Sequence, residues 1–317
     1  MMKKGRKTYG RNRKHNGHLL MMSAPAIIWF VLFCYVPMFG AAFAFKNFTP
    51  KPGESLVRNL FVNSRWCGFE NFSFLVRSSD MSNILFNTLF YNVIFLVAGI
   101  AVPVVLAILL TEIHGKRFLG VVQMVLLLPY FLSWVIVGYC LYGFLATDEG
   151  LVNHVLKLLG SAGVQWYQSP KYWRGILIAT GLWKSTGYSM VIYLCAITSI
   201  DRTLYESASL DGAGFWDRVR YITLPQLLPT IITIFILQIG SLLNSDFGLF
   251  YQVPLDSDSL ASVTQTLDVY VYKALMQQAN FSYSSAASFL QSFIGCILLV
   301  TAHVIISKMG DQDSVGV

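Results

Sequence analysis

The chain has 317 residues, of which 55% are hydrophobic and only 12% are charged, and its formal net charge is +7. A soluble domain usually has about 25% charged residues, so a chain with half that share keeps most of its surface away from water. This composition excludes an ordinary soluble protein and indicates an integral membrane protein.

The positive charge is concentrated at the N-terminus, where seven Lys and Arg precede the first long apolar stretch. Such a tail is typical of a topology anchor that rests on anionic lipid. We therefore interpret residues 1–18 as a basic cytoplasmic tail whose partner is membrane lipid and not nucleic acid. The apolar stretch that follows is too long for a cleaved signal peptide, and five more stretches come after it.

Six apolar stretches follow this tail, and each is longer than the roughly 20 residues that a helix needs to cross the hydrocarbon core. Because lipid offers the backbone no hydrogen-bond partner, stretches of this kind have to be helical. The sequence therefore predicts an all-α fold with six transmembrane helices near residues 19–45, 81–111, 118–147, 175–200, 221–245 and 274–307.

Lys and Arg are distributed unequally between the segments that connect these helices. With the N-terminus inside, the inner segments carry thirteen Lys and Arg in 54 residues, whereas the outer segments 46–80, 148–174 and 246–273 carry nine in 90. The positive-inside rule then predicts that both termini are cytoplasmic. Residues 19–307 form the predicted membrane domain, and residues 308–317 form a cytoplasmic C-terminal tail.

Aromatic residues lie deep in the third predicted span. Tyr130 and Trp134 are one turn apart on one side of the helix and about halfway across the membrane. An aromatic belt at the membrane interface explains the aromatic residues nearer the outer end. For these two deeper residues we weigh that belt against the lining of a solute pathway.

The fourth predicted span contains Lys184, flanked by Trp183 and, one turn later, Tyr188. A lysine inside a span is energetically costly and usually faces a cavity or a partner. Its long stem also allows it to reach toward the interface, so this second interpretation stays open. If the helices adjoin, Asp246 at the outer end of the fifth span is a possible ion-pair partner, and an acidic sugar is another.

The fifth predicted span places Ser241 and Asn244 on one face of the helix, at a spacing of three. Hydrogen bonds between helices explain such residues as well as contacts with a substrate do, and the sequence leaves both open. The candidate substrate pathway therefore comprises Tyr130, Trp134, Trp183, Lys184, Tyr188, Ser241 and Asn244.

The inner segment between the fourth and fifth spans reads as two short helices joined by a turn. Thr203 is the expected cap of the first helix, whose first turn holds Glu206, where an acid suits the positive end of the helix dipole. Residues 211–214 end this helix because glycine adopts backbone angles that other residues avoid. A second amphipathic segment covers 215–222, and Pro225 is expected to open the next span. The sequence predicts an elbow at the inner membrane face that docks into a cleft of a soluble partner.

This segment resembles the signature loop of binding-protein-dependent ABC importer permeases. That pattern is Glu-Ala-Ala, three residues, Gly, nine residues, Ile, one residue and Leu-Pro. The matching positions here are Glu206, Ala208, Gly212, Ile222, Leu224 and Pro225, and Ser207 replaces the first alanine. The additional Asp211 and Ala213, followed by Trp216, look like the carbohydrate-transporting branch. The stretches YVPMFGAAFAFKNF, FLGVVQMVLLLPYFLSWVIVG and TLDVYVYKAL resemble permeases for oligosaccharides and polysaccharide breakdown products.

The resemblance implies a transmembrane permease subunit with type I ABC importer architecture in a bacterial cytoplasmic membrane. Its partners are then a cytoplasmic ABC ATPase, an extracellular solute-binding protein and a second, different permease subunit that completes the pore. It also implies that the loop at about 201–225 is a coupling helix held in a groove of the ATPase. The ATPase-coupling residues implied are Glu206, Ser207, Ala208, Asp211, Gly212, Ala213, Gly214, Ile222, Leu224 and Pro225.

No G-x-x-x-x-G-K-[ST] phosphate loop occurs in the sequence, so another chain has to bind ATP and Mg²⁺. We therefore expect no cofactor in this chain and no enzymatic activity of the chain by itself. The cysteines and histidines have no metal-ligand spacing, so we assign no metal site.

The sequence argues against two other classes of membrane protein and leaves one alternative solute open. A secondary transporter driven by an ion gradient tends to have internal repeats and buried carboxylates, and no predicted span has an acid in its middle. A membrane-embedded enzyme needs acids, histidines or cysteines that converge at membrane depth, and no such set is present. An importer for a solute other than a sugar remains open, although aromatic faces and neutral polar groups suit a carbohydrate.

Overall fold

The structure, a computed structural model, describes residues 13–48, 53–55, 58–73, 79–113 and 115–314. Most of the predicted basic tail (1–12) and the end of the predicted C-terminal tail (315–317) lie outside the described residues. Within the described ranges the strands are β1 (Lys46–Asn47) and β2 (Arg65–Trp66), an antiparallel pair in which Lys46 lies opposite Trp66. Almost all other regular structure is helical, so the predicted all-α class is confirmed.

The helical elements follow the chain in this order: α1 (Arg13–Phe30), η1 (Val31–Tyr35), α2 (Val36–Met38), η2 (Phe39–Phe45), η3 (Asn59–Asn63), η4 (Glu70–Phe72), α5 (Ser79–Thr111), α6 (Lys116–Leu127), η5 (Leu128–Phe131), α7 (Trp134–Leu145), α8 (Leu151–Leu158), η6 (Trp166–Gln168), α9 (Pro170–Thr198), α10 (Arg202–Leu210), α11 (Phe215–Arg218), η7 (Val219–Thr223), α12 (Leu224–Gly240), η8 (Gly248–Gln252), η9 (Asp258–Leu260), α13 (Ala261–Thr264), α14 (Leu267–Met276) and α15 (Phe281–Ser314).

Four helical runs in the described residues are long and apolar enough to cross a membrane: Met21–Phe45, Asp80–Thr111, Phe215–Gly240 and Phe281–Lys308. A bent helix pair makes a fifth if it counts as one span. The fourth predicted span is present as the continuous helix α9, which has Lys184 and several other polar residues along it. The chain is thus a multi-pass membrane protein, and the count of six spans stays a prediction.

The third predicted span is not one straight helix. The segments Lys116–Phe131 and Trp134–Leu145 meet at an angle of 99°. Leu132 is extended between them, and the Ser133 side chain accepts a hydrogen bond from the Ile136 amide at 3.3 Å, which caps the start of α7. A hydrogen-bonding residue in extended conformation at this point starts a new helix and does not continue the old one.

The ends of the fifth and sixth predicted spans were wrong. The helical run that corresponds to the fifth predicted span begins at Phe215, ten residues before Pro225. It passes through the π-helical turn η7 into α12. Pro225 lies in the first turn of α12, as predicted, but the helical run itself begins earlier, at Phe215. The run ends at Gly240, and the last run begins at Phe281, later than the predicted residue 274.

The segment predicted as the outer loop 246–273 belongs to the core of the molecule. Leu249, Phe250 and Val253 are at most 2% exposed and pack with Tyr91 of α5 and Trp173 of α9. Hydropathy alone missed this segment because η8, η9, α13 and α14 are each too short to read as a span.

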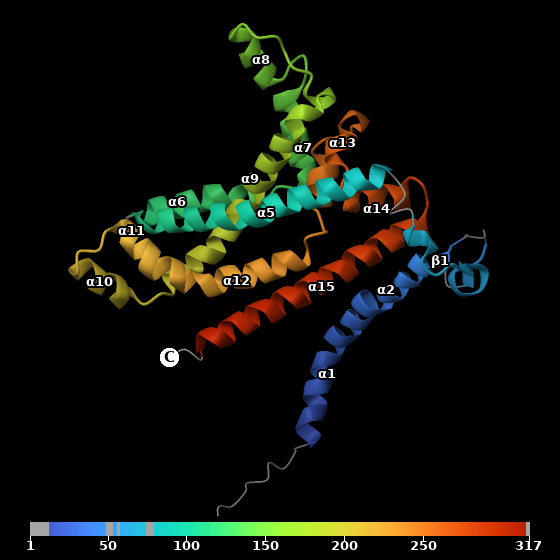
Figure 1. The fold of residues 1–317 in the computed structure, drawn as a ribbon, viewed down its shortest axis with the longest axis horizontal. Helices are drawn as coiled ribbons and strands as arrows, with labels where there is room; N and C mark the ends of the chain where they lie inside the picture. Colours follow the sequence, from blue (N-terminus) through green and yellow to red (C-terminus); the bar gives the residue numbers. More distant parts are fainter. Residues whose placement is uncertain (1–12, 49–52, 56–57, 74–78, 114, 315–317) are drawn as a thin grey trace, which may run out of the picture.

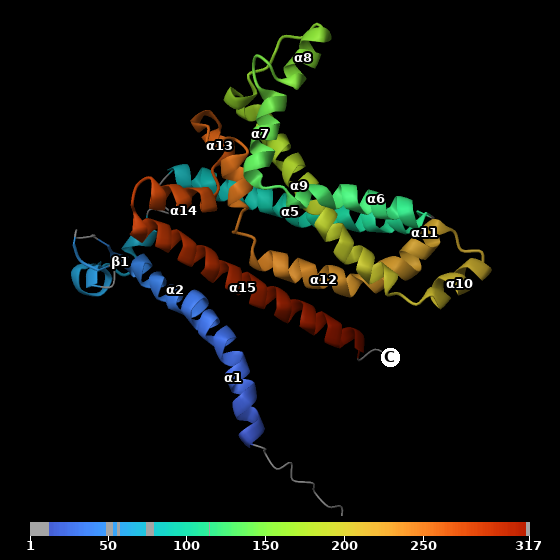
Figure 2. The same ribbon diagram turned by 180° about the vertical axis from the view of Figure 1, so that it is seen from behind.

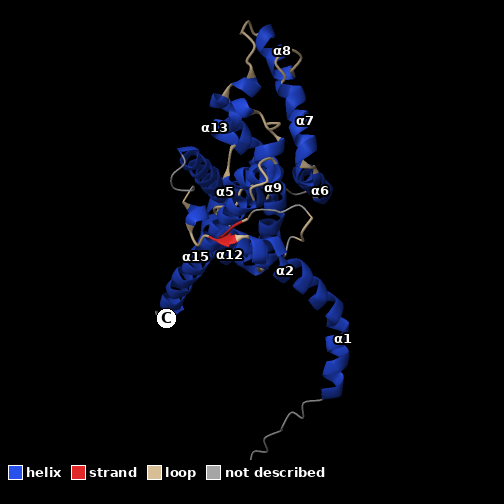
Figure 3. Cartoon of the chain, turned by 90° about the vertical axis from the view of Figure 1, so that its right-hand side faces the viewer, coloured by secondary structure: helices blue, strands red, loops and turns tan. Residues whose placement is uncertain are grey.

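The helices form a bundle from which two arms extend (Figures 1 and 2). In the bundle α9 packs along α5, and α12 lies beside α15. One arm is α1, in which residues 21–30 are exposed apart from the half-buried Ala24, and the other consists of α7 and α8 (Figure 3). The elbow of α10 and α11 lies at one end of the bundle, and α12 leads from it toward the centre (Figure 1).

Candidate functional site

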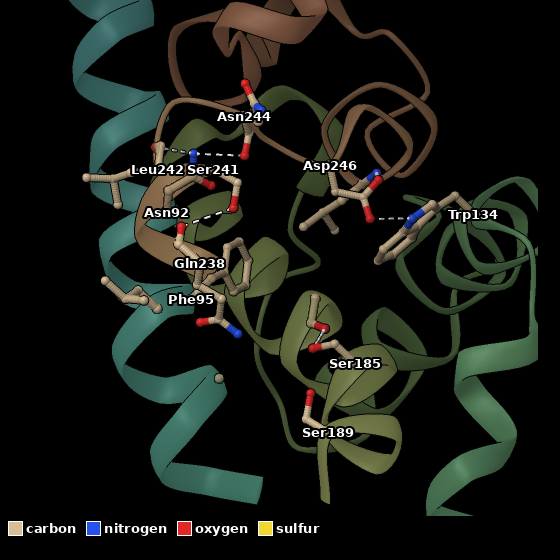
Figure 4. A pocket seen from close by; sticks show the side chains of 14 residues that line it. Asn92, Phe95, Trp134, Ser185, Ser189, Gln238, Ser241, Leu242, Asn244 and Asp246 are labelled. Atoms are coloured by element: carbon tan, nitrogen blue, oxygen red, sulfur yellow. Dashed lines mark hydrogen bonds between the residues drawn. The ribbon is translucent and has the colours of Figure 1, made fainter. Parts of the chain in front are cut away.

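A polar pocket of about 270 Å³ lies in the bundle where α5, α7, α9 and the segment after α12 meet (Figure 4). Its lining combines hydroxyl and amide groups, two aromatic rings, one carboxylate and no Lys or Arg. The lining residues are Asn92, Phe95, Leu96, Gly99, Trp134, Gly181, Ser185, Ser189, Gln238, Ser241, Leu242, Asn244, Asp246 and Leu249. Such a surface suits a neutral polar solute that also presents an apolar face.

Side chains from other helices stabilise the non-helical backbone that follows α12. Asn92 Nδ2 of α5 donates to the carbonyl oxygens of Leu242 at 2.8 Å and Asn244 at 3.2 Å. Asp268 of α14 accepts a hydrogen bond from the Ser245 amide at 2.6 Å. Non-helical backbone at membrane depth is tolerated only where protein groups bond to it or where it lines a cavity. This segment is hydrogen-bonded by Asn92 and Asp268 and also lines the pocket.

The pocket wall on the α7 side is fixed by Trp134 and Asp246. Trp134 Nε1 donates to Asp246 Oδ2 at 2.8 Å, as Figure 4 shows, and Asp246 Oδ1 accepts from the Gly248 amide at 2.9 Å. A Cβ atom at Gly248 would collide with the Trp134 ring. Glycine at this position therefore allows the indole to lie directly against the turn.

Lys184 contacts residues on both sides of the bend before α7 and lies outside the pocket lining. Its Nζ donates to Tyr130 O at 2.8 Å and lies 5.1 Å from the centroid of the Trp134 ring. The carbonyl of Tyr130 belongs to η5, just before the bend between α6 and α7, so the lysine stabilises that bend. Among the described residues Lys184 forms no ion pair with Asp246, and it is not part of the pocket lining.

Three of the seven predicted pathway residues line the pocket: Trp134, Ser241 and Asn244. The expectation that Ser241 and Asn244 share a helix face was wrong, because α12 ends at Gly240. The turn after the helix, and not helical spacing, brings them to the same pocket.

The remaining predicted pathway residues lie elsewhere. The rings of Tyr130 and Tyr188 stack with centroids 4.6 Å apart, outside the pocket lining. Trp183 borders a separate apolar pocket of about 490 Å³ between α7 and α9. Neither position brings these side chains to the polar pocket.

Sequence reasoning missed the residues that hold the pocket together. Asn92 lies in the second predicted span, where an amide among apolar residues is itself a signal for a hydrogen bond between helices. Asp268 lies in the predicted outer loop 246–273, where an acidic residue does not indicate a hydrogen bond inside the bundle. Its Oδ2 also accepts from Ser245 Oγ at 2.8 Å and from Gln291 Nε2 at 3.0 Å.

The elbow has the predicted helix–turn–helix form. Gly212 has a φ of +80°, a conformation that side chains disfavour, and it ends α10 as expected. The Gly214 amide donates to Asp217 Oδ2 at 3.0 Å and so begins the next helical run. The cap of α10 is Asp201 and not Thr203: Asp201 Oδ1 accepts from the Thr203 amide at 3.0 Å. This hydrogen bond holds the pKa of Asp201 below its usual value.

The first arm of the elbow is open to a partner. No residue of α10 is buried, and Glu206 and Ser207 are exposed while Ala208 is half-buried. In the turn and the second arm, Asp211, Gly212, Gly214, Leu224 and Pro225 are exposed and Ala213 and Ile222 are half-buried. Behind α10 lies a pocket of about 370 Å³, whose charged lining residues are Glu112, Arg202, Glu206 and Arg218.

Residues 99–249 match the family described as binding-protein-dependent transport system inner membrane component. The chain is 34% identical over 295 residues to the polygalacturonan/rhamnogalacturonan transport system permease protein YteP of Bacillus subtilis (strain 168), an alignment that covers 93% of this chain and 89% of YteP.

Two crystal structures have the same fold. One is a bacterial ABC transporter involved in the import of the acidic polysaccharide alginate, with a TM-score of 0.83, 30% identity, and coverage of 93% of this chain and 96% of the other. The second is a bacterial alginate ABC transporter in complex with an alginate pentasaccharide-bound periplasmic protein, with a TM-score of 0.84, 29% identity, and coverage of 95% and 98%. The family match includes the elbow and eleven of the fourteen residues that line the pocket.

Proposed function

The chain belongs to the binding-protein-dependent transport system inner membrane components, and from this premise we propose that it is the permease subunit of an ATP-driven importer for an oligosaccharide. The family consists of transport pore components and not of catalysts. ATP and Mg²⁺ are bound and ATP is hydrolysed by a separate cytoplasmic ATPase. A second, different permease subunit completes the pore in a bacterial cytoplasmic membrane.

The composition of the polar pocket carries the proposal of a sugar cargo. Sugars present hydroxyl groups and apolar ring faces, and the pocket offers neutral amides and hydroxyls beside the rings of Trp134 and Phe95. Gln238 Oε1 is buried and has no hydrogen-bond partner within the described ranges. A solute hydroxyl at this oxygen supplies the missing donor and offsets the cost of burying it.

The charge of the pocket lining limits which part of an oligosaccharide can bind in the pocket. Asp246 is the one charged residue in the lining, and Lys184 is directed to Tyr130 O instead. An anionic sugar residue here is repelled by the carboxylate with no cation to offset it. We therefore expect an uncharged sugar residue at this wall, even where other residues of the oligosaccharide are charged.

The proposed partners occupy opposite ends of the bundle. An extracellular binding protein delivers the solute, as the complex of the alginate transporter with its periplasmic protein supports. The ATPase receives the elbow, whose exposed α10 carries Glu206. The unbroken helical run Phe215–Gly240 connects the elbow with Gln238 in the pocket wall. Displacement of the elbow by ATP-driven closure of the ATPase therefore moves the pocket wall directly.

The test is a gentle detergent pull-down from the native membrane, followed by uptake in lipid vesicles that contain the recovered complex. Recovery of an ATPase, a second permease and a binding protein, with ATP-dependent uptake of a labelled oligosaccharide, is the expected result. Recovery of the chain alone, with uptake driven by an ion gradient, contradicts the proposal and favours a secondary transporter.

A further inference from the structure

Two hydroxyl groups connect the two arms of the elbow. Tyr205 OH of α10 lies 3.0 Å from Thr223 Oγ1 at the end of η7. Thr223 Oγ1 itself lies 3.4 Å from Arg218 O, to which it donates. A threonine hydroxyl has a single proton, so Tyr205 is the donor in the first bond and Thr223 the donor in the second. The result is a short chain of hydrogen bonds from α10 into the π-helical turn.

The covalent connection between the arms is a short turn at the surface. It passes through Asp211, Gly212, Ala213 and Gly214, and all four residues are exposed or half-buried. Glycine adds backbone freedom at two of the four positions. Because no residue of α10 is buried either, packing does not fix α10 rigidly to the bundle.

The receiving end of the hydroxyl pair is rigid. Thr223 is 4% exposed, and Val219 and Leu227, one turn to either side, are 7% and 0% exposed. Both belong to a core cluster with Ile108 of α5 and Tyr193 of α9. A displacement that reaches Thr223 therefore reaches a packed part of the bundle, where side chains cannot move independently.

The same helical run extends from Thr223 to the polar pocket. Gln238 follows Thr223 by fifteen residues, roughly 22 Å along a helix. The run is continuous over this distance, so a shift of its first turn is carried to the pocket wall.

We propose that the Tyr205 and Thr223 hydroxyls are the joint through which movement of α10 reaches the helical run and the pocket. The proposal rests on the proposed function, because it takes α10 as the element on which the ATPase acts. Tyr205 and Thr223 are positioning residues in this scheme, since their hydroxyls act through the helical run and not on solute or ATP.

The experiment measures solute imported per ATP hydrolysed by the complete complex in lipid vesicles. Tyr205→Phe and Thr223→Val each remove one hydroxyl with little change of shape. We expect each to lower the ratio of solute to ATP by about two- to tenfold, the range of one lost hydrogen bond. The double variant should show no greater loss than Thr223→Val alone, because both substitutions break the contact between the two hydroxyls and only Thr223→Val also removes the bond to Arg218 O.

Two control variants separate the joint from a general effect on the elbow. Ser209→Ala removes a hydroxyl that bonds only within α10, to Tyr205 O at 2.7 Å, and should leave the ratio unchanged. Thr223→Ser keeps the hydroxyl and should retain most of the ratio. The thermal stability of each complex is measured in parallel, because a purely structural tie would lower stability without changing solute per ATP.

An unchanged ratio in Tyr205→Phe would overturn the joint while leaving the proposed function intact. Additive losses in the double variant would also overturn it, since the two hydroxyls would then act separately. If Thr223→Val fails to assemble, Tyr205→Phe and Thr223→Ser decide the question, because Tyr205 is only half-buried and Thr223→Ser keeps the buried hydroxyl and loses a single methyl group. ATP-independent uptake by the wild-type complex would instead overturn the proposed function.

Discussion

The elbow and the polar pocket are built in opposite ways. The elbow is one contiguous segment whose first helix has no buried residue and depends on a cap, a glycine turn and one hydroxyl pair. The pocket is assembled from α5, α7, α9 and the segment after α12, with supporting side chains from α14 and α15. A surface that docks a partner has to be accessible, whereas a polar cavity within a membrane has to satisfy every backbone group it exposes. Substitutions in the elbow should therefore change coupling, and substitutions beneath the pocket should change stability.

The largest effect on transport is expected for Gly212→Trp. No atom lies within 4 Å of a Cβ built at this position, so the effect arises from the φ of +80° and from bulk on the docking surface. ATP-coupled uptake should fall at least tenfold while membrane insertion is retained. Gly160→Trp is the matched control, because Gly160 has a φ of +79° and equal space but lies in the loop after α8. Unchanged uptake in Gly212→Trp would contradict the coupling role of the elbow.

The largest effect on stability is expected for Asp268→Ala. The substitution leaves the Ser245 amide without its acceptor and removes one of the two acceptors of both the Ser245 hydroxyl and Gln291 Nε2. One half-buried amide without a partner and the loss of two further hydrogen bonds to a carboxylate should lower the free energy of unfolding by about 1–3 kcal/mol. Thermal unfolding of the purified complex is the measurement, and Asp258→Ala, at an exposed acid on the same segment, is the control. Equal stability of the two variants would show that the network does not hold the pocket.

Trp134→Phe tests the pocket wall with a smaller change. The ring remains, but the hydrogen bond from Nε1 to Asp246 is lost. Because solvent can replace this donor at the exposed Asp246, we expect normal assembly and an uptake rate that falls by about two- to tenfold. Tyr139→Phe, at a residue that is 65% exposed on the outside of α7, should leave uptake unchanged. Normal uptake kinetics in Trp134→Phe would show that the hydrogen bond from Trp134 to Asp246 does not contribute to transport.

The smallest effect concerns the cap of α10. The Asp201 carboxyl group accepts the Thr203 amide more strongly when it is ionised, so its pKa is lower in the folded elbow than in the unfolded chain. Its contribution is therefore present above the unfolded pKa and is lost as the pH falls through the lower folded pKa. The protection of the Thr203 amide against hydrogen exchange, relative to its intrinsic exchange rate, should fall in that acidic range. Asp201→Asn keeps a capping oxygen but does not titrate, so its exchange should lack this additional step.

Local sequence determined the membrane class, the apolar runs and the elbow. Charge density and the length of apolar stretches can be counted directly along the sequence. The cap, the glycine turn and the motif from Glu206 to Pro225 all lie within a single segment. These features can be predicted because the interactions that cause them connect residues close in the chain. Even here the cap is Asp201 and not the predicted Thr203, because the Asp201 carboxylate accepts the amide of Thr203, which lies inside the first turn of α10.

Only the tertiary structure decided the bend before Trp134, the end of α12 at Gly240 and the burial of the segment at 246–273. Each interrupts a helix or buries a loop at a cost that side chains far away in the sequence offset. Asn92 stabilises Leu242 from a distance of 150 residues, and Lys184 reaches Tyr130 O across 54. Hydropathy averaged over a window cannot register such pairs. The pocket therefore follows from long-range hydrogen bonds between polar side chains and broken helices, which become visible only once the helices are packed.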